Sequence, residues 1–284
     1  MKRLKKRSGS TRIRSSLLRC AAAALLAVLC TGCAQKPIRD EIDLADRYHP
    51  VGKERIRGML ESLAAANKKA PATLSAEFVA VGSFSGKNYR VSGFARFDRG
   101  KNALEINFTD AIFRSPLATV VQEGDEIRIY YPAEKRLYIE NSNTIDLARY
   151  GVAGIDFKII HRIITGAIPL LDRHVVKRGL AANQGSETLL ILENLHYYQT
   201  ISFEGEKPRK ILLVNRGSGE RFEAYLKKPI ERDGAGFFGA ITISAPQARL
   251  SVDITFSKVV LNAPITIKRA KEIPIHPSTT IIKI

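Results

Sequence analysis

Apolar and polar residues alternate over many short stretches of the chain, which is the pattern of half-buried β-strands. In residues 250–257, Leu, Val, Ile and Phe alternate with Ser, Asp, Thr and Ser, and turn-forming residues separate such stretches, as at 98–102. The pattern predicts about eleven strands. They cover residues 89–98, 103–108, 117–122, 126–131, 136–140, 187–193, 197–203, 210–214, 221–227, 240–244 and 250–257.

Two other stretches show the three- and four-residue spacing of apolar side chains that predicts amphipathic helices. They cover 52–67 and 155–168, and a proline follows each of them. The second helix carries a wide apolar stripe, with Lys158, His161 and Arg162 on its remaining face. Because strands and helices do not alternate in βαβ order, a doubly wound parallel sheet is excluded. We therefore expect a mainly β (α+β) fold, with the first helix at the N-terminus. The strands would form a half-open antiparallel β-barrel, closed by the second helix as a lid.

A sheet with one apolar face under a lid helix encloses an apolar interior. The pattern allows this interior to be either packed or hollow. Residues 259–284 are less regular and could add edge strands to the sheet. If the interior is hollow, we expect an acyl-chain cavity lined by the helix residues Phe157, Ile160, Ile163, Ile164 and Ile168 and by the strand residues Val91, Phe97, Ile129 and Leu213.

The first 33 residues have the layout of an export signal. Basic side chains extend to Arg19, an apolar run follows over 21–30, and small residues precede Cys33. The apolar run is shorter than the about 20 residues of a membrane-spanning helix, although an uncleaved anchor is the alternative. Residues 1–32 hold eight basic residues and no acid, so the formal charge falls from +17 for the chain to +9 for residues 33–284. This moderate excess favours anionic headgroups or acidic partners and is no nucleic-acid signature.

The segment Leu29-Cys30-Thr31-Gly32-Cys33 resembles the lipobox of bacterial lipoproteins, although an aliphatic residue is usual where Cys30 stands. That resemblance implies a signal peptide over 1–32, diacylglycerol on Cys33 and a lipidated tether over 33–51. Ala34, which is not Asp, favours the outer membrane by the sorting rules of such proteins. All three cysteines lie in the first 33 residues, so a disulfide framework or a Cys-ligated zinc site is excluded from the mature chain.

Motifs that carry catalytic or metal chemistry are weak or missing. Gly234, Gly236 and Gly239 spell GxGxxG, but a charged segment precedes them and a strand follows, so they indicate a hairpin turn rather than a dinucleotide site. The five histidines are not at a spacing typical of metal ligands. We expect a protein that is not an enzyme and that uses no cofactor and no metal.

Three segments resemble the LolA/LolB lipoprotein-carrier superfamily, and specifically its lipid-anchored outer-membrane branch, the LolB-like proteins. They are Phe113-Arg114-Ser115-Pro116-Leu117-Ala118-Thr119, Ile127-Arg128-Ile129-Tyr130-Tyr131-Pro132 and Ile160-His161-Arg162-Ile163-Ile164-Thr165-Gly166-Ala167-Ile168-Pro169. The resemblance covers roughly 52–258, within a barrel domain of residues 52–284. The chain is longer than typical members at its C-terminal end.

The resemblance implies a cavity for lipoprotein acyl chains and a membrane-contacting loop at Leu117, beside Phe113 and Ile112. Leu117 is expected to be exposed, while Phe113 could equally be a buried anchor. The implied function is to accept lipoproteins, with a soluble periplasmic carrier as a further partner, and to insert them into the outer membrane from its periplasmic side. The alternative is an envelope lipoprotein of the same fold that binds lipid or a partner and transfers nothing. We expect a monomer without nucleic-acid partners.

Overall fold

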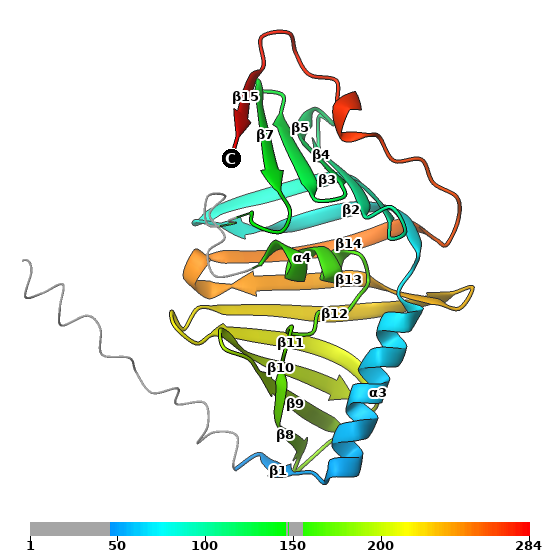
Figure 1. Ribbon diagram of the computed structural model, residues 1–284, viewed down its shortest axis with the longest axis vertical. Helices are drawn as coiled ribbons and strands as arrows, with labels where there is room; N and C mark the ends of the chain where they lie inside the picture. Colours follow the sequence, from blue (N-terminus) through cyan, green and yellow to red (C-terminus); the bar gives the residue numbers. More distant parts are fainter. Residues whose placement is uncertain (1–45, 146, 148–155) are drawn as a thin grey trace, which may run out of the picture. The chain divides into compact units, whose positions relative to one another are not determined.

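Fifteen strands of the described chain form one continuous sheet, in the order β1-β8-β9-β10-β11-β12-β13-β14-β2-β3-β4-β5-β6-β7-β15 (Figure 1). The computed structural model describes residues 46–145, 147 and 156–284, so Cys33 and the start of the second predicted helix lie outside the described residues. The strands are β1 (Tyr48–Pro50), β2 (Thr73–Phe84), β3 (Lys87–Asp98), β4 (Ala103–Asp110), β5 (Pro116–Glu123), β6 (Glu126–Tyr131), β7 (Arg136–Asn141), β8 (Val175–Ala182), β9 (Glu187–Glu193), β10 (Tyr197–Glu204), β11 (Lys207–Asn215), β12 (Arg221–Arg232), β13 (Ala235–Ala245), β14 (Leu250–Leu261) and β15 (Thr280–Lys283).

Two α-helices accompany the sheet in the described residues, α3 (Lys53–Lys69) and α4 (Phe157–Ile164). Two short 3-10 helices, η3 (Pro246–Ala248) and η4 (Ala270–Glu272), lie between strands. All these elements belong to one compact unit, Tyr48–Ile284. A unit with its own core and complete strand pairing is expected to fold without the residues that precede it.

The strands that the sequence predicts are all present, as β3–β7 and β9–β14. The predicted total of about eleven is wrong, because β1, β2, β8 and β15 also belong to the sheet. In β2 the apolar run over 78–81 obscures the alternation. Strands β1 and β15 have only three and four residues. Such short strands depend on their neighbours rather than on a pattern of their own.

The expected half-open barrel is also wrong, since the sheet is open. Its edge strands are β1, which pairs with β8, and β15, which pairs with β7 in parallel. Alternation along a strand reports which side chains face the interior. It does not report whether the first and last strands of a sheet meet, so the sequence left closure undecided.

Helix α3 lies across one end of the strands (Figure 1), with Met59 and Leu63 buried. The Ser62 hydroxyl donates to the backbone oxygen of Glu206 in the β10–β11 turn. Gly179 on β8 permits the close approach of α3, because a Cβ there would lie only 2.7 Å from the side chain of Ile56.

Helix α4 packs against one face of the sheet, which we call the inner face (Figure 1). Where this face belongs to β9–β12 it is filled by buried apolar side chains, which form the main core. They include Leu190, Leu192, Ile201, Phe203, Ile211, Leu213, Phe222, Ala224 and Leu226.

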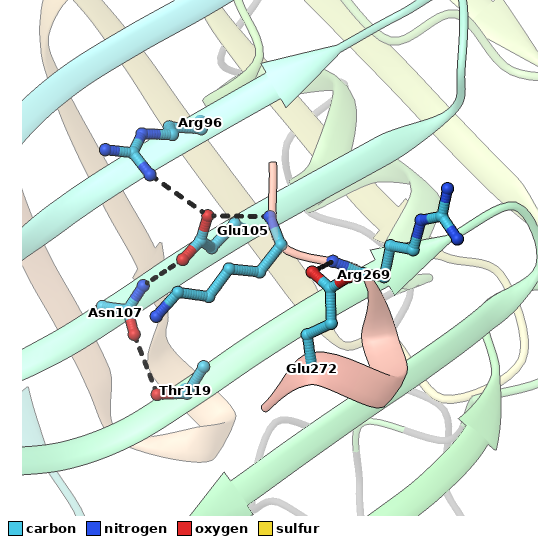
Figure 2. A network of polar contacts seen from close by, with 7 residues as sticks. Arg96, Glu105, Asn107, Thr119, Arg269 and Glu272 are labelled. Atoms are coloured by element: carbon cyan, nitrogen blue, oxygen red, sulfur yellow. Dashed lines mark hydrogen bonds and ion pairs between the residues drawn. The ribbon is translucent and has the colours of Figure 1, made fainter. Parts of the chain in front are cut away.

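The C-terminal segment, residues 262–284, crosses the opposite, outer face of β4–β6 before it ends in β15. Its polar anchor is Glu105, a fully buried carboxylate on β4 (Figure 2). Glu105 accepts hydrogen bonds from the backbone N of Lys268 at 3.4 Å and from Asn107 Nδ2 at 3.0 Å, and it pairs with Arg96 at 3.4 Å. These partners compensate the cost of burying the charge.

Further contacts attach the same segment to the sheet. The backbone N of Ala270 donates to Glu123 Oε2 at 3.2 Å, and that of His276 donates to the Tyr130 hydroxyl at 3.1 Å. A small apolar cluster lies beneath the segment. It consists of Val121, Tyr130, Leu137, Ala270 and Ile273.

Candidate functional site

Helix α4 is short and is fixed at both ends. The side chain of Asp156 caps its first turn by accepting from the backbone N of Lys158 at 2.8 Å. The helix ends at Gly166, whose φ of +84° suits glycine. A Cβ on Gly166 would also lie 2.8 Å from the ring of Phe237. Helix α4 therefore has a defined start and end, and its apolar face packs on the sheet.

Two buried amides hold the segment that follows α4. Asn67 of α3 donates to the backbone oxygen of Ile168 at 3.0 Å and accepts from its nitrogen at 2.7 Å. Gln199 on β10, which is fully buried, donates to the backbone oxygen of Pro169 at 2.7 Å and accepts from the nitrogen of Leu171 at 3.1 Å. Because both amides are satisfied on both atoms, they fix the position of α4 relative to the sheet.

A cavity of about 460 Å³ lies between α4 and the inner face of β2–β6, β13 and β14. No lining residue carries a charge, and only Tyr131 and Thr165 carry a hydroxyl. The Thr165 hydroxyl is already engaged, since Oγ1 lies 2.8 Å from the backbone oxygen of His161. The rest of the wall consists of Leu74, Phe78, Ala80, Val91, Ala95, Phe97, Leu104, Ile106, Phe108, Ala118, Val120, Ile127, Ile129, Ile145, Leu147, Phe157, Ile160, Ile164, Ile243, Val252, Ile254 and Phe256.

Small side chains create this space. Ala80, Ala95 and Ala118 stand on three different strands and all line the cavity. The volume is within the range of about 300–1,000 Å³ that is common for small-molecule sites. An apolar cavity of this kind binds by burial of hydrocarbon, without directional polar contacts.

The structure places six of the nine predicted cavity residues on the cavity wall. They are Val91, Phe97, Ile129, Phe157, Ile160 and Ile164.

The other three predicted residues, Ile163, Ile168 and Leu213, do not line the cavity. Ile163 is fully buried in the main core, because it lies on the side of α4 that faces the packed strands. Ile168 follows the helix and is held by Asn67. Leu213 lies on β11, beyond the other side of α4.

None of the predicted cavity residues lies on β2, β4 or β14, so wall residues such as Phe78, Ile106 and Ile254 were missed. In β4 and β14 the alternation places Ile106 and Ile254 on the apolar face of their strand, whereas in β2 the apolar run over 78–81 obscures this signal for Phe78. The inward direction of that face became known only from the fold.

His161 on α4 is half-buried, and its Nε2 atom is buried without a hydrogen-bond partner among the described residues. Its ring lies edge-on to Phe97, with centroids 5.2 Å apart, and near Phe157 at 5.9 Å. Burial, and secondarily the charge of Arg162, lowers the pKa of His161 from 6.5 to about 4. The imidazole is therefore neutral at physiological pH and adds no charge beside the cavity.

A second, smaller pocket of about 290 Å³ lies on the other side of α4. Its wall is mixed, with charged groups from the helix and polar groups from the β9–β10 region. The polar members are Asp156, Lys158, Arg162, Asp172, Asn194, His196, Tyr197 and Gln199. Several of them bond to neighbouring backbone, so this pocket is a solvated cleft rather than a site for hydrocarbon.

The β4–β5 tip, residues 111–115, projects apolar side chains outward. Ile112 is 80% exposed and Phe113 is 83% exposed. Both backbone nitrogens donate to Asp110 Oδ1, at 2.9 and 2.7 Å, and these bonds hold the pKa of Asp110 below its usual value. Leu117, which was expected to be exposed, is 39% exposed, less than Ile112 and Phe113 because it belongs to β5 at a bulge.

The tip lies close to the cavity along the sheet. Asp110, which precedes the tip, pairs with the cavity residue Val91 on β3. Ala118, which follows Leu117, is also a cavity residue. The cavity wall and the exposed tip are therefore close neighbours along β4 and β5.

In residues 46–145, 147 and 156–284, no three His, Cys, Asp or Glu side chains converge as metal ligands. Among the helices of the same residues, none is long and apolar enough to cross a membrane.

This chain resembles known proteins in structure but not detectably in sequence. No protein-family model and no curated protein matches the chain. A LolA superfamily protein from Nitrosomonas europaea superposes with a TM-score of 0.50 at 10% identity, over 73% of this chain and 94% of that one. An outer membrane lipoprotein-sorting protein domain from Vibrio parahaemolyticus gives 0.52 at 11% identity, over 76% and 95%. This chain has a LolA-like fold.

A DUF1329 family protein from Desulfovibrio piger gives a similar result, with a TM-score of 0.53 at 11% identity over 74% of this chain and 94% of that one. All three similarities are similarities of fold, at 10–11% sequence identity. At such low identity they establish the LolA-like fold alone. The kind of ligand must be inferred from the chemistry of the cavity.

Proposed function

We propose that this protein is a lipid-anchored envelope lipoprotein that binds acyl chains in the cavity under α4 and delivers them, as lipoproteins, to the outer membrane. The observation that carries the proposal is the cavity itself, whose wall of 24 residues contains no charge and only two hydroxyl groups. Such a wall favours hydrocarbon over any polar ligand, because a polar group inside would lose its hydrogen bonds to water.

The energetics suit a carrier that works without an energy source. Burial contributes about 0.8 kcal/mol per methylene group, so about ten methylenes contribute about 8 kcal/mol against water. Against a bilayer the gain is close to zero, because the bilayer interior is equally apolar. Release therefore requires only that a membrane be close to the cavity.

Two features would bring the membrane close. The resemblance to a lipobox makes Cys33 the lipidated residue and 33–47 a tether, shorter than the expected 33–51 because Tyr48–Pro50 forms β1, and it would keep the protein at the periplasmic face of the outer membrane. The β4–β5 tip would then enter the bilayer edge through Ile112 and Phe113, with Leu117 beside them. A soluble periplasmic carrier is the partner that would load the cavity.

Delivery can be tested with a transfer assay that follows a lipoprotein from a soluble complex to liposomes. Phe113→Glu and Leu117→Glu should both reduce transfer, and Phe113→Glu should do so more because its side chain is more exposed. Neither should change the melting temperature, since an exposed side chain buries little area. Leu195→Glu is the matched control, because Leu195 is 79% exposed and lies in the turn between β9 and β10, which six strands separate from β4 in the sheet.

The outcome separates the two candidate functions. Normal transfer by Phe113→Glu would remove the tip from the mechanism. Acyl-chain binding without any transfer by the wild type would favour a binding lipoprotein that delivers nothing. Mass spectrometry of the mature N-terminus tests the anchor, and a Cys33 without lipid would contradict it.

A further inference from the structure

Four cations lie at the same end of the sheet as the apolar tip, on three neighbouring hairpins that comprise the tip and the two hairpins on one side of it. Lys87 and Arg90 belong to the β2–β3 hairpin, Arg114 to the β4–β5 tip and Arg249 to the β13–β14 turn. All four are exposed, and none takes part in an ion pair within the described residues. We call this surface, residues 83–90, 110–117 and 246–250, the tip rim.

Backbone contacts place the three hairpins side by side. The nitrogen of Ser85 donates to the backbone oxygen of Arg249 at 3.2 Å, which joins the β2–β3 and β13–β14 turns. On the other side, Val91 pairs with Asp110, so the neighbouring Arg90 lies level with the start of the β4–β5 tip. The cations and the exposed apolar residues thus share one end of the strands.

The tip rim contains a single acid, Asp110, and its carboxylate is occupied by the backbone of the tip. The turns at the opposite end of the same strands differ. The β5–β6 turn carries Glu123, Asp125 and Glu126, and the β10–β11 turn carries Glu204 and Glu206. The tip rim therefore combines the apolar tip with an excess of positive charge, whereas the turns at the opposite end mix these acids with cations such as Lys101 and Lys207.

We infer that the tip rim is a docking surface for a bilayer rich in anionic phospholipid. The inference rests on the proposed membrane contact of the β4–β5 tip and names the lipid that this contact selects. Cations beside exposed aliphatic and aromatic side chains are typical of surfaces that bind the membrane interface. An acidic protein partner would account for the cations, but the exposed Ile112 and Phe113 on a projecting tip favour a bilayer.

The docked orientation also explains how the cavity meets the membrane. Val91 lines the cavity and directly follows Arg90 in β3. Headgroup phosphates held by Arg90 and Arg114 would therefore lie at the tip end of the cavity wall. The β5–β6 turn at the other end, with Glu123, Asp125 and Glu126, would be repelled by the same membrane, which favours this orientation.

The inference can be tested by co-sedimentation of residues 46–284, which lack the expected anchor, with two kinds of vesicle. One is phosphatidylcholine alone and the other is phosphatidylcholine mixed with phosphatidylglycerol. We expect binding to the anionic vesicles that weakens as salt is raised. Each cation near an anionic surface contributes about fivefold, or about 1 kcal/mol, so Arg90→Gln with Arg114→Gln should weaken binding about 25-fold.

Lys101→Gln with Lys207→Gln is the matched control, because it removes the same charge at the opposite end of the strands and should leave binding unchanged. A thermal melt checks that both double variants fold. Equal binding to the two kinds of vesicle, or equal loss in the two double variants, would overturn the inference. Binding of an acylated peptide in the cavity is measured in parallel. If the protein binds this peptide but does not bind anionic vesicles, the inference about the tip rim fails and the carrier proposal stands.

Discussion

On one side of α4 the inner face of the sheet encloses the apolar cavity, and on the other side it is packed apart from the smaller polar pocket. On the hollow side, Ala80, Ala95 and Ala118 leave a cavity of about 460 Å³. On the packed side, side chains such as Phe203 and Phe222 are at most 2% exposed. The same alternating strand pattern forms both halves, so side-chain volume, rather than fold, decides which half can take a ligand.

The two halves also differ on the outer face. Behind the hollow half, the C-terminal segment buries Glu105 and covers Val121. Behind the packed half, β11 and β12 carry a Lys210–Glu223 ion pair at 2.9 Å and Tyr225, which is 36% exposed. The C-terminal segment 262–284, which we call the outer cover, thus adds buried contacts on the outer face of the strands whose inner face lines the cavity.

The largest effect should come from Ile163, which faces the packed half. Ile163→Ala removes a fully buried side chain and should lower the free energy of unfolding by about 2–5 kcal/mol. Ile160→Ala, on the cavity side of the same helix, should cost less than half as much, because the cavity already surrounds it. Denaturant melts of both variants test this, and equal losses would contradict the division of α4 into two faces.

Filling the cavity should remove ligand binding without loss of stability. Ala95→Phe places an aromatic ring in the space and should weaken acyl-chain binding about a hundredfold, or about 3 kcal/mol. Ala224→Phe is the matched change in the packed half, where it should destabilise the fold by about 1–3 kcal/mol through overpacking. Displacement of an apolar dye by a lipidated peptide, beside a thermal melt, distinguishes them. The carrier proposal fails if lipidated and unlipidated peptides displace the dye alike.

Loosening the outer cover should affect only the hollow half. Glu105→Ala leaves the backbone N of Lys268 and the side chain of Arg96 without their acceptor, and should cost about 1–3 kcal/mol. Hydrogen exchange should then increase in 262–284 and β4–β7. An equal increase in β9–β12 would mean that the cover does not act locally.

The smallest expected effect is a loss of stability at acidic pH that comes from His161. The folded pKa of His161 is about 4 and its ordinary value is 6.5, so the unfolded state binds the proton first as the pH falls. The contribution of His161 is complete above pH 6.5 and is lost as the pH falls toward 4. We expect a loss of about 1–2 kcal/mol near pH 5, which His161→Phe should abolish. Melts of the two proteins at pH 7 and pH 5 should therefore differ only for the wild type, and an equal pH response would exclude His161 as its source.

The sequence patterns predict the local elements of this fold better than the way in which those elements pair. Alternation predicted all eleven strands that it named, and helical spacing predicted α3 and α4. It could not predict β15, because a four-residue strand exists only through its pairing with β7. Nor could it decide closure of the sheet, which depends on contacts between its ends.

The candidate site shows the same limit. Residues Ile160 and Ile164 were predicted from one apolar stripe together with Ile163, yet the stripe is wide enough to touch both halves of the inner face. Only the fold separates the cavity wall from the packed core. The exposed tip was predicted as a loop. The sequence did not show that the backbone nitrogens of Ile112 and Phe113 bond to Asp110, in a turn that leaves both side chains exposed.

The central claim is that an acyl chain occupies the hollow half. A palmitoylated peptide with a photoactivatable diazirine in its acyl chain, irradiated with residues 46–284, tests it most directly because the labelled residues can be mapped by mass spectrometry. We expect adducts on β2, β3 and α4, around Ala80, Val91 and Ile160, and their loss in Ala95→Phe. Adducts concentrated on β9–β12, or labelling that Ala95→Phe leaves unchanged, would contradict the account.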